Sequence, residues 1–402
     1  MRIYALFLLL ILLPVTASAE VFRFQYAEGE KHRILTSVSE DVLINGRLNN
    51  HTEIINRITE EVLHSGAEDA EIYGTFMTSE EATLPQNPDQ TKNFVWGTEY
   101  ESYFTRDMLG LYDVADGYFM PTVRNIPVFP EEDVQPGDRW YADGAEVHDM
   151  RRDFAIPDPL IVPFTATYQY TGTEQTEDAT LHVITAEYSL YTEYPVPRNA
   201  DDSFPVAIMG FSNRTIYFDN DIGKVITWKE NFRIVLETKR GDRIEYRGSS
   251  RTEVDRSSLG NRAAMAAAVQ EQIDSLGIEN TAVTATERGV TISIENIQFL
   301  PDSAWLTPGE KDKLALIAEI LAPFADHDLL ITGHTARVGS EASCQELSVK
   351  RSQAVADYLK KLGLSDDYHV FTQGKGSREP IADNSTEAGR ERNRRVEITI
   401  IE

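Results

Sequence analysis

The sequence predicts an α+β chain with two folded units, an acidic β-rich region at residues 20–255 and a mixed domain at residues 281–402. In the first unit, runs of β-branched and aromatic residues are cut by turn residues, which is typical of strands. In the second, strand-like and helix-like segments alternate, which indicates helices packed on one face of a mixed sheet. A length of 402 residues is more than one average domain needs. Between the units, residues 256–280 are alanine-rich and predict a helical linker.

The first residues have the layout of a cleavable secretory signal, residues 1–19. Arg2 precedes an apolar stretch from Ile3 to Leu13, and a breaker, Pro14, and the small residue Ala19 follow it. No other segment approaches the twenty apolar residues of a membrane-spanning helix. We expect cleavage after Ala19 and an exported mature chain without a transmembrane helix, an uncleaved anchor helix being the alternative.

Strands are expected through most of residues 20–255, beginning with the alternating stretch VFRFQY. Turn residues at Asp219–Gly223 and Lys239–Asp242 predict hairpins. One helix is predicted early, at His51–His64, because its apolar residues fall close to helical spacing; they are Ile54, Ile55, Ile58 and Leu63.

Prolines interrupt the middle of this region and predict an irregular connection without central strands; they are Pro121, Pro127, Pro130, Pro136, Pro157, Pro159 and Pro163. A membrane barrel would need strands with an uninterrupted apolar face. Charges instead fall on both faces of several strands, as in KENFRIVLETKRGDRIEY. A soluble curved sheet or half-barrel is therefore favoured.

The net charge of −27 argues against nucleic acid or anionic lipid as a partner. From Val283 onward the net charge is only −5, so −22 belongs to the residues before it. Cys344 is the single cysteine and cannot form an intrachain disulfide. We expect it to be a buried, inert thiol rather than a reactive one.

Two helices of the C-terminal unit can be placed in detail. Thr307, Pro308 and Glu310 predict a capping box at the start of the first helix, whose buried stripe is Leu314, Ile317 and Leu321. The second helix lies in the segment QELSVKRSQAVADYLKKLG, and Arg351 sits on its apolar stripe. A guanidinium there requires a partner, and a structural ion pair is the simplest interpretation.

With these residues in view, the C-terminal third resembles the OmpA-like domain family of outer-membrane proteins, peptidoglycan-associated lipoproteins and flagellar stator subunits. The resemblance rests on the order of five pieces: ENIQFLPDSAWLTPGE, ITGHTARVGS, LSVKRSQAVADYL, GKGSREPIADNSTEAGR and NRRVEI. It implies a βαβαββ-type two-layer sandwich that binds the peptide stem of peptidoglycan without a covalent bond.

The resemblance also implies a site. In the family a loop acid takes the ammonium of the stem diamino acid, and an arginine of the next helix takes its carboxylate. Carried over, the candidate residues are Thr335, Ala336, Glu341, Cys344, Leu347, Arg351, Arg394 and Arg395. Arg351 lies in the L-S-x-x-R pattern of the family, which begins at Leu347. Ala336, however, stands where the family usually has the acid, and Cys344 stands where it often has an asparagine. Glu341, in the same loop, could substitute for the acid.

Two hypotheses follow. The first is an exported envelope protein, placed in the periplasm with outer-membrane association left open, whose OmpA-like domain binds peptidoglycan weakly. The alternative is a degenerate domain that serves as a structural or protein-interaction module, with other envelope proteins as partners and function carried by the β-rich half. No enzyme motif is present, and no cofactor is implied. Asp219 and Asp221 fit a hairpin better than a calcium loop, and His327 and His334 fit ordinary structural roles better than a metal pair.

Overall fold

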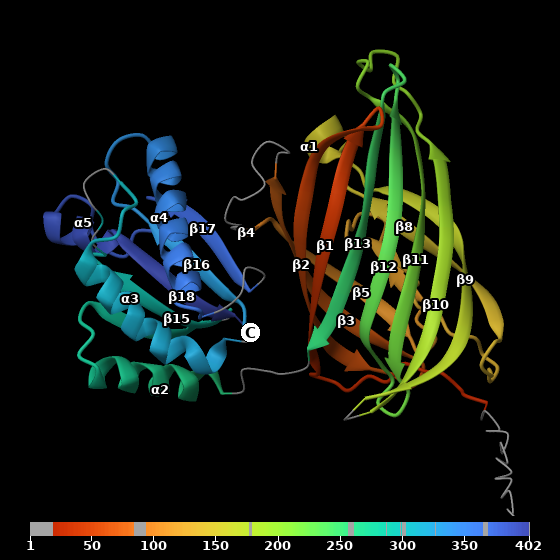
Figure 1. The fold of residues 1–402 in the computed structure, drawn as a ribbon, viewed down its shortest axis with the longest axis horizontal. Coiled ribbons are helices and arrows are strands. Elements are labelled where there is room, and N and C mark those ends of the chain that lie inside the picture. The colour runs from red at the N-terminus through yellow and green to blue at the C-terminus, as the bar shows by residue number, and fades with distance from the viewer. Residues whose placement is uncertain are drawn as a thin grey trace, which may run out of the picture.

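The computed structural model consists of two β-sheets with helices around the second one (Figure 1). It describes residues 19–83, 94–176, 179–255, 261–286, 288–297, 299, 303–325, 327–364 and 369–401. All but the last residue of the expected signal peptide lies outside the described residues. Among the described residues, no helix has the length and apolar character needed to cross a membrane.

The first sheet has twelve strands, and every neighbouring pair that shares it is antiparallel. The prediction that residues 20–255 are mostly strand is confirmed. From edge to edge the strands are β6 (Tyr112–Val114), β5 (Glu99–Asp107), β3 (Asp69–Thr83), β2 (Arg47–Ser65), β1 (Lys31–Ile44), β13 (Arg243–Asp255), β12 (Lys224–Thr238), β11 (Pro205–Asp219), β10 (Thr180–Glu193), β9 (Leu160–Gln175), β8 (Arg139–His148) and β7 (Val123–Arg124).

This sheet is strongly curved, and its two edges approach each other (Figure 1). Asn125, next to β7, accepts a hydrogen bond from the backbone of Tyr112 in β6 at 2.8 Å and donates one to the Asp143 carbonyl of β8 at 3.1 Å. Both predicted hairpins are confirmed, since β11 pairs with β12 and β12 with β13. Aromatic and aliphatic side chains, among them Phe22, Phe24 and Tyr168, form a core on the concave side.

The helix predicted at His51–His64 is wrong, because these residues belong to β2. Both faces of this strand are covered, which is why its apolar residues imitate helical spacing. Val62 packs with Phe76 and Phe104 on one face, whereas Ile55 on the other contacts the C-terminal domain. Strands buried on both faces lose the simple alternation that identifies a half-buried strand.

The proline-rich segment is irregular as predicted between Ala115 and Asp138, apart from the short β7, but Pro163 lies within β9. The prediction that these prolines exclude a central strand is therefore wrong at this position. Pro163 pairs with Ala145 of β8, while the ladder to β10 begins only at Thr167. The strand is locally an edge there, and proline is tolerated because no ladder bond from its nitrogen is needed. The one-turn helix α1 (Arg151–Phe154) connects β8 to β9.

The second sheet is mixed and has six strands. Their order is β14 (Thr281–Thr286), β15 (Gly289–Glu295), β18 (Arg395–Ile401), β16 (Leu329–His334), β17 (Val370–Gly376) and β4 (Phe94–Val95). β16, β17 and β4 run parallel, and the other pairs are antiparallel. Strands and helices alternate along the chain as predicted, whereas the addition of β4 from the N-terminal region was not foreseen.

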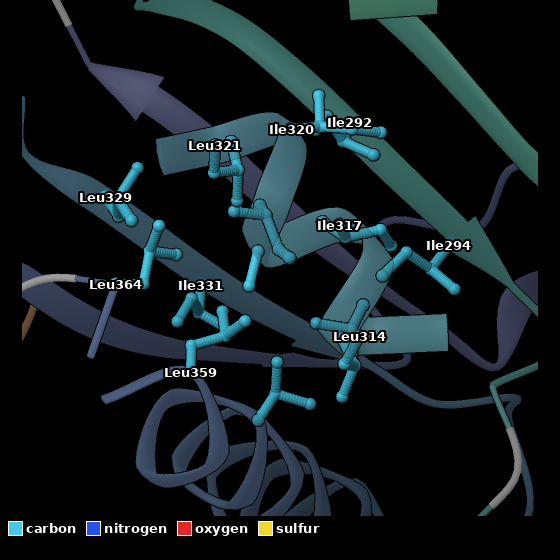
Figure 2. Packing of buried hydrophobic residues seen from close by; sticks show 14 of the residues in the cluster. Ile292, Ile294, Leu314, Ile317, Ile320, Leu321, Leu329, Ile331, Leu359 and Leu364 are labelled. Atoms are coloured by element: carbon cyan, nitrogen blue, oxygen red, sulfur yellow. The ribbon is translucent and has the colours of Figure 1, made fainter. Parts of the chain in front are cut away.

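Helices α2 (Arg262–Ser275), α3 (Pro308–Leu321) and α4 (Glu341–Lys361) share one core with this sheet, and a 3₁₀ turn, η1 (Ala322–Phe324), and α5 (Glu387–Asn393) complete the domain. Figure 2 shows Leu314, Ile317 and Leu321 of α3 gathered with Ile331 of β16 and Leu359 of α4. Because Val269 and Ile273 of α2 belong to the same core, the expected linker helix is part of the C-terminal domain.

The helix α3 begins at Pro308 as expected, but the predicted capping box is wrong. The side chain of Thr307 makes no capping hydrogen bond. Glu310 instead lies 3.4 Å from Lys313, one turn along the same helix.

The two sheets meet at a mixed junction. Ile55 and Met77 of the curved sheet pack with Phe94, Trp96, Leu330, Phe371 and Ile401. Beside them, the fully buried Asp328 accepts a hydrogen bond from Arg57 Nε at 2.8 Å and contacts His369 Nδ1 at 2.9 Å. An apolar patch and a buried ion pair thus fix the C-terminal domain against β2.

Candidate functional site

The candidate loop, Thr335–Ser340, joins the end of β16 to the start of α4. The backbone N–H of Thr335 donates to the Gly376 carbonyl at 2.9 Å, which fixes the loop to the end of β17. At its other end the Ser340 side chain caps α4 by accepting a hydrogen bond from the Ser343 N–H at 3.1 Å. The short side chain of Ser340 and its extended backbone are both typical of a helix N-cap.

The structure brings Ala336 and Cys344 together, and both are buried. The Cys344 thiol donates to the carbonyl oxygens of Ala336 at 3.7 Å and Val338 at 3.2 Å. A methyl group and a thiol therefore occupy the positions where the resemblance implies an acid and an amide. Neither side chain supplies the strong oxygen acceptor that an ammonium group requires.

Thr335 carries a buried hydroxyl oxygen without a hydrogen-bond partner among the described residues. A buried hydroxyl without a partner costs free energy unless a water or a ligand satisfies it. Thr335 thus carries a buried hydroxyl that no described residue satisfies.

Glu341 lies at the exposed first turn of α4, where it faces Arg378 rather than the buried corner. Its carboxylate is 3.7 Å from Arg378 Nε, and 70% of its side chain is exposed. Arg378 also donates to Gln345 of the same helix. To replace the missing loop acid, Glu341 would have to leave this ion pair.

Arg351, on α4 one turn after the half-buried Leu347, lies over an aromatic ring. Its guanidinium carbon is 4.7 Å from the centroid of Phe299, and its Nε donates to the Ser303 carbonyl at 3.4 Å. Both partners belong to the segment that precedes α3, so Arg351 spans from α4 to that segment. The ring stacking and the bond to Ser303 hold the guanidinium at this position between α4 and the segment before α3.

Two close approaches set the position of α4, and the sequence interpretation missed them. A Cβ atom at Gly333 would lie 2.2 Å from the Ser348 carbonyl oxygen, and one at Gly374 would lie 2.5 Å from Val349. Only glycine allows the helix to sit this close to β16 and β17. The glycines in ITGH and TQGKG were the available signal.

The paired arginines of the NRRV motif separate in the structure. Arg395 is buried, with its Nε 2.7 Å from Glu397 and its Nη1 donating to the Glu379 carbonyl at 3.1 Å. Arg394 is half-buried and pairs with Glu387 at 3.1 Å. Burial by itself would raise the pKa of Glu397, but hydrogen bonding and charge from His334 and the charge of Arg395 lower that pKa to about 2. The contacts of Arg395 are therefore those of a structural residue.

Asn393, from the same motif, is the organising residue that sequence reasoning overlooked. It is fully buried and accepts hydrogen bonds from the backbone of Ile381 and Ala382. Its amide donates to Asn384, whose oxygen also accepts the Arg337 N–H at 3.1 Å. This chain of bonds ties the segment before α5 to the candidate loop.

No group of three or more His, Cys, Asp or Glu side chains within the described ranges is placed to hold a metal ion. Asp219 accepts hydrogen bonds from the N–H groups of Asp221 and Ile222, as expected for a hairpin turn. His334 is 3.5 Å from Glu397 and buried in the sheet.

The matches to known proteins fall in the C-terminal part of the chain. The sequence model of the OmpA family matches residues 298–394. The "Peptidoglycan-binding protein ArfA" of Mycobacterium tuberculosis is 42% identical over 104 residues, which are 26% of this chain and 32% of that protein. The "Probable lipoprotein YiaD" of Escherichia coli is 34% identical over 126 residues, 31% of this chain and 57% of that protein. The chain thus spans about a third of the length of the first of these relatives.

Among solved structures, the cell wall anchor of the T6SS from Pseudomonas aeruginosa is 29% identical, with a TM-score of 0.29. The similarity covers 33% of this chain and 96% of that one. The family match includes β16, the candidate loop, α4 and the first two residues of the NRRV motif, Asn393 and Arg394. The C-terminal part of the chain, across residues 298–394, is therefore an OmpA-like domain.

Proposed function

We propose that the chain is an exported protein of the cell envelope whose OmpA-like domain associates non-covalently with the peptide stem of peptidoglycan. The observation that carries the proposal is the family match at residues 298–394, which contains Arg351 in a stacked, half-buried position on α4. A relative that matches this domain at 42% identity is named as a peptidoglycan-binding protein. The signal-like residues 1–19 support export to the periplasm.

The association is weak, because Ala336 supplies no acid for the ammonium of the stem. A hydrogen bond to a charged group contributes about 1.5–3 kcal/mol, which corresponds to about a ten- to hundredfold change in affinity. In this proposal the ligand is held by Arg351, which would exchange its bond to the Ser303 carbonyl for one to the ligand, and by the Thr335 hydroxyl.

Retention of the purified mature chain on insoluble peptidoglycan tests this proposal, with serum albumin as the blank. Ala336→Asp should increase retention by about ten- to a hundredfold, since it restores a charged acceptor. Ala336→Asn is the matched control, because it adds nearly the same volume without the charge. No enrichment of the mature chain over albumin would refute binding.

A second pair of variants locates the site. Arg351→Ala should weaken retention, whereas Arg392→Ala should not, because Arg392 is exposed and pairs with Glu295 at 2.8 Å. Circular dichroism verifies that each variant is folded. Unchanged retention of a folded Arg351→Ala variant would place the polymer elsewhere.

The alternative proposal is a domain that no longer binds the wall and acts as an interaction module for the β-rich half. The observation that favours it is the junction itself, where β4 extends the OmpA-like sheet and Arg57 pairs with Asp328. Under this proposal the unmodified mature chain is not retained on peptidoglycan. Retention of the unmodified chain above the albumin blank would exclude it.

A further inference from the structure

The concave side of the curved sheet contains a cavity that the OmpA-like domain does not share. It has a volume of about 100 Å³ and is lined by strands from both halves of the sheet, including β2, β5, β11 and β13. One water occupies about 10–15 Å³ by this measure, so the cavity holds about seven to ten water-sized positions. That volume suits a small organic molecule.

Most of the wall is aliphatic or aromatic, but one cation stands out in it. Arg106 lies between two rings, with its guanidinium carbon 3.7 Å from the centroid of Phe24 and 4.8 Å from that of Tyr112. Its buried Nε has no hydrogen-bond partner among the described residues. A guanidinium removed from water is costly unless an anion satisfies its donors.

The other cations of the wall already have counter-ions. Lys224 lies 2.8 Å from Glu30, and Arg214 lies 3.0 Å from Glu230. Their charges are therefore neutralised locally. Arg106 is the cavity cation for which no carboxylate lies within ion-pair distance in the described part of the chain.

Glu60 also lines the cavity but is a poor counter-ion. Burial raises the pKa of its carboxyl group, and the charges of Arg106 and Lys224 do not reverse that shift. The wall thus offers the planar set of guanidinium donors of Arg106 to one anionic group.

We propose that this cavity binds a small organic carboxylate, with the carboxylate on Arg106 and a short apolar chain against the aliphatic wall. A bidentate pair with guanidinium fits the planar carboxylate. Ile72, Ile216 and Val254 are among the aliphatic residues that receive the chain. The volume of about 100 Å³ restricts the ligand to a short chain.

Calorimetric titration of the mature chain with sodium hexanoate tests the proposal, and hexanamide is the uncharged control. Hexanoate should bind at one site, and about ten- to a hundredfold more tightly than hexanamide. In the series acetate, butyrate and hexanoate, affinity should rise about fourfold per methylene group. Palmitate should not bind better than hexanoate, which separates a short carboxylate from a lipid acyl chain.

Variants assign the site to Arg106. Arg106→Gln should abolish the preference for hexanoate over hexanamide, while Arg106→Lys should weaken hexanoate binding but keep the preference. Arg233→Gln is the matched control, since this exposed arginine of β12 pairs with Glu245 outside the cavity. Absence of saturable hexanoate binding at millimolar concentration, equal binding of hexanamide, or unchanged binding by folded Arg106→Gln would each overturn the proposal.

Discussion

Replacing Asp328 with Asn should weaken the junction between the curved sheet and the OmpA-like domain more than any single exposed ion pair could. Asp328 is fully buried and precedes β16. Its carboxylate lies 2.8 Å from Arg57 and 3.8 Å from Arg33, both on the curved sheet, and 2.9 Å from His369. Asparagine keeps the size of the side chain but removes the charge that faces these groups.

The expected loss follows from burial. Burial alone would raise the pKa of Asp328, but the hydrogen bond from His369 and the charges of Arg57 and Arg33 lower it below its usual value. The residue is therefore charged in the folded chain. Removing one partner of a buried ion pair costs about 3–5 kcal/mol, and we expect a loss of this size in the free energy of unfolding.

Calorimetry and limited proteolysis of the mature chain measure the effect, with Asp41→Asn as the matched control. Asp41 also contacts a histidine and an arginine, His51 at 3.0 Å and Arg247 at 3.4 Å, but 35% of its side chain is exposed. An exposed pair contributes about 0–1 kcal/mol. Asp328→Asn should therefore separate unfolding into two transitions or expose cleavage sites, and Asp41→Asn should do neither.

Two further measurements make the reasoning refutable. Combining Asp328→Asn with Arg57→Met should recover part of the loss, because the second change removes the charge left without its carboxylate.

A lowered folded pKa adds stability that is present above the unfolded value of about 3.9 and is lost as pH falls through the folded value. The difference between Asp328→Asn and the parent chain should thus persist from pH 7 to pH 5 and shrink in stronger acid. A loss equal to that of Asp41→Asn would refute the argument.

Three other variants are informative. Burial and the nearby Glu80 raise the pKa of Glu40 to about 7, so above this pH the folded chain contains a buried charge that destabilises it. Because Gln carries no charge, denaturation should show Glu40→Gln to be more stable than the parent chain by about 1–3 kcal/mol at pH 8 and equally stable at pH 4. Gly333→Ala forces α4 off the sheet and should cost about 1–3 kcal/mol in urea denaturation, with reduced peptidoglycan retention. Ile317→Ala, a fully buried residue labelled in Figure 2, should cost about 2–5 kcal/mol by the same measurement.

The C-terminal domain was largely predictable because its signals are local. The helices α3 and α4 each have an apolar stripe at helical spacing, and α3 begins at Pro308. The order of motifs, read by resemblance, also placed Ala336 and Cys344 in one corner, where the structure finds them in contact. In the NRRV motif, the sequence interpretation selected the arginine pair, whereas Asn393 makes the hydrogen bonds that connect this region to the candidate loop.

The N-terminal half was harder because its determinants are distant in sequence. β2 is buried on both faces only because another domain covers one of them, and β4 has just two residues that pair with β17. Arg57 and Asp328 are 271 positions apart. Alternation identifies strands, but it does not say which face becomes the inside of a curved sheet, so Arg106 gave no sign of lining a cavity.

The junction and the candidate loop occupy opposite ends of one strand. β16 begins beside Asp328 at the junction and ends at His334, directly before the loop. Six strand residues at about 3.3 Å each span about 20 Å. Figure 1 shows α5, whose preceding segment is bonded to this loop, at the end of the domain farthest from the curved sheet. Contact between the two sheets therefore leaves the candidate loop accessible. Asp328→Asn should loosen the junction without changing retention on peptidoglycan. A parallel loss of both would mean that the curved sheet itself contributes to wall binding.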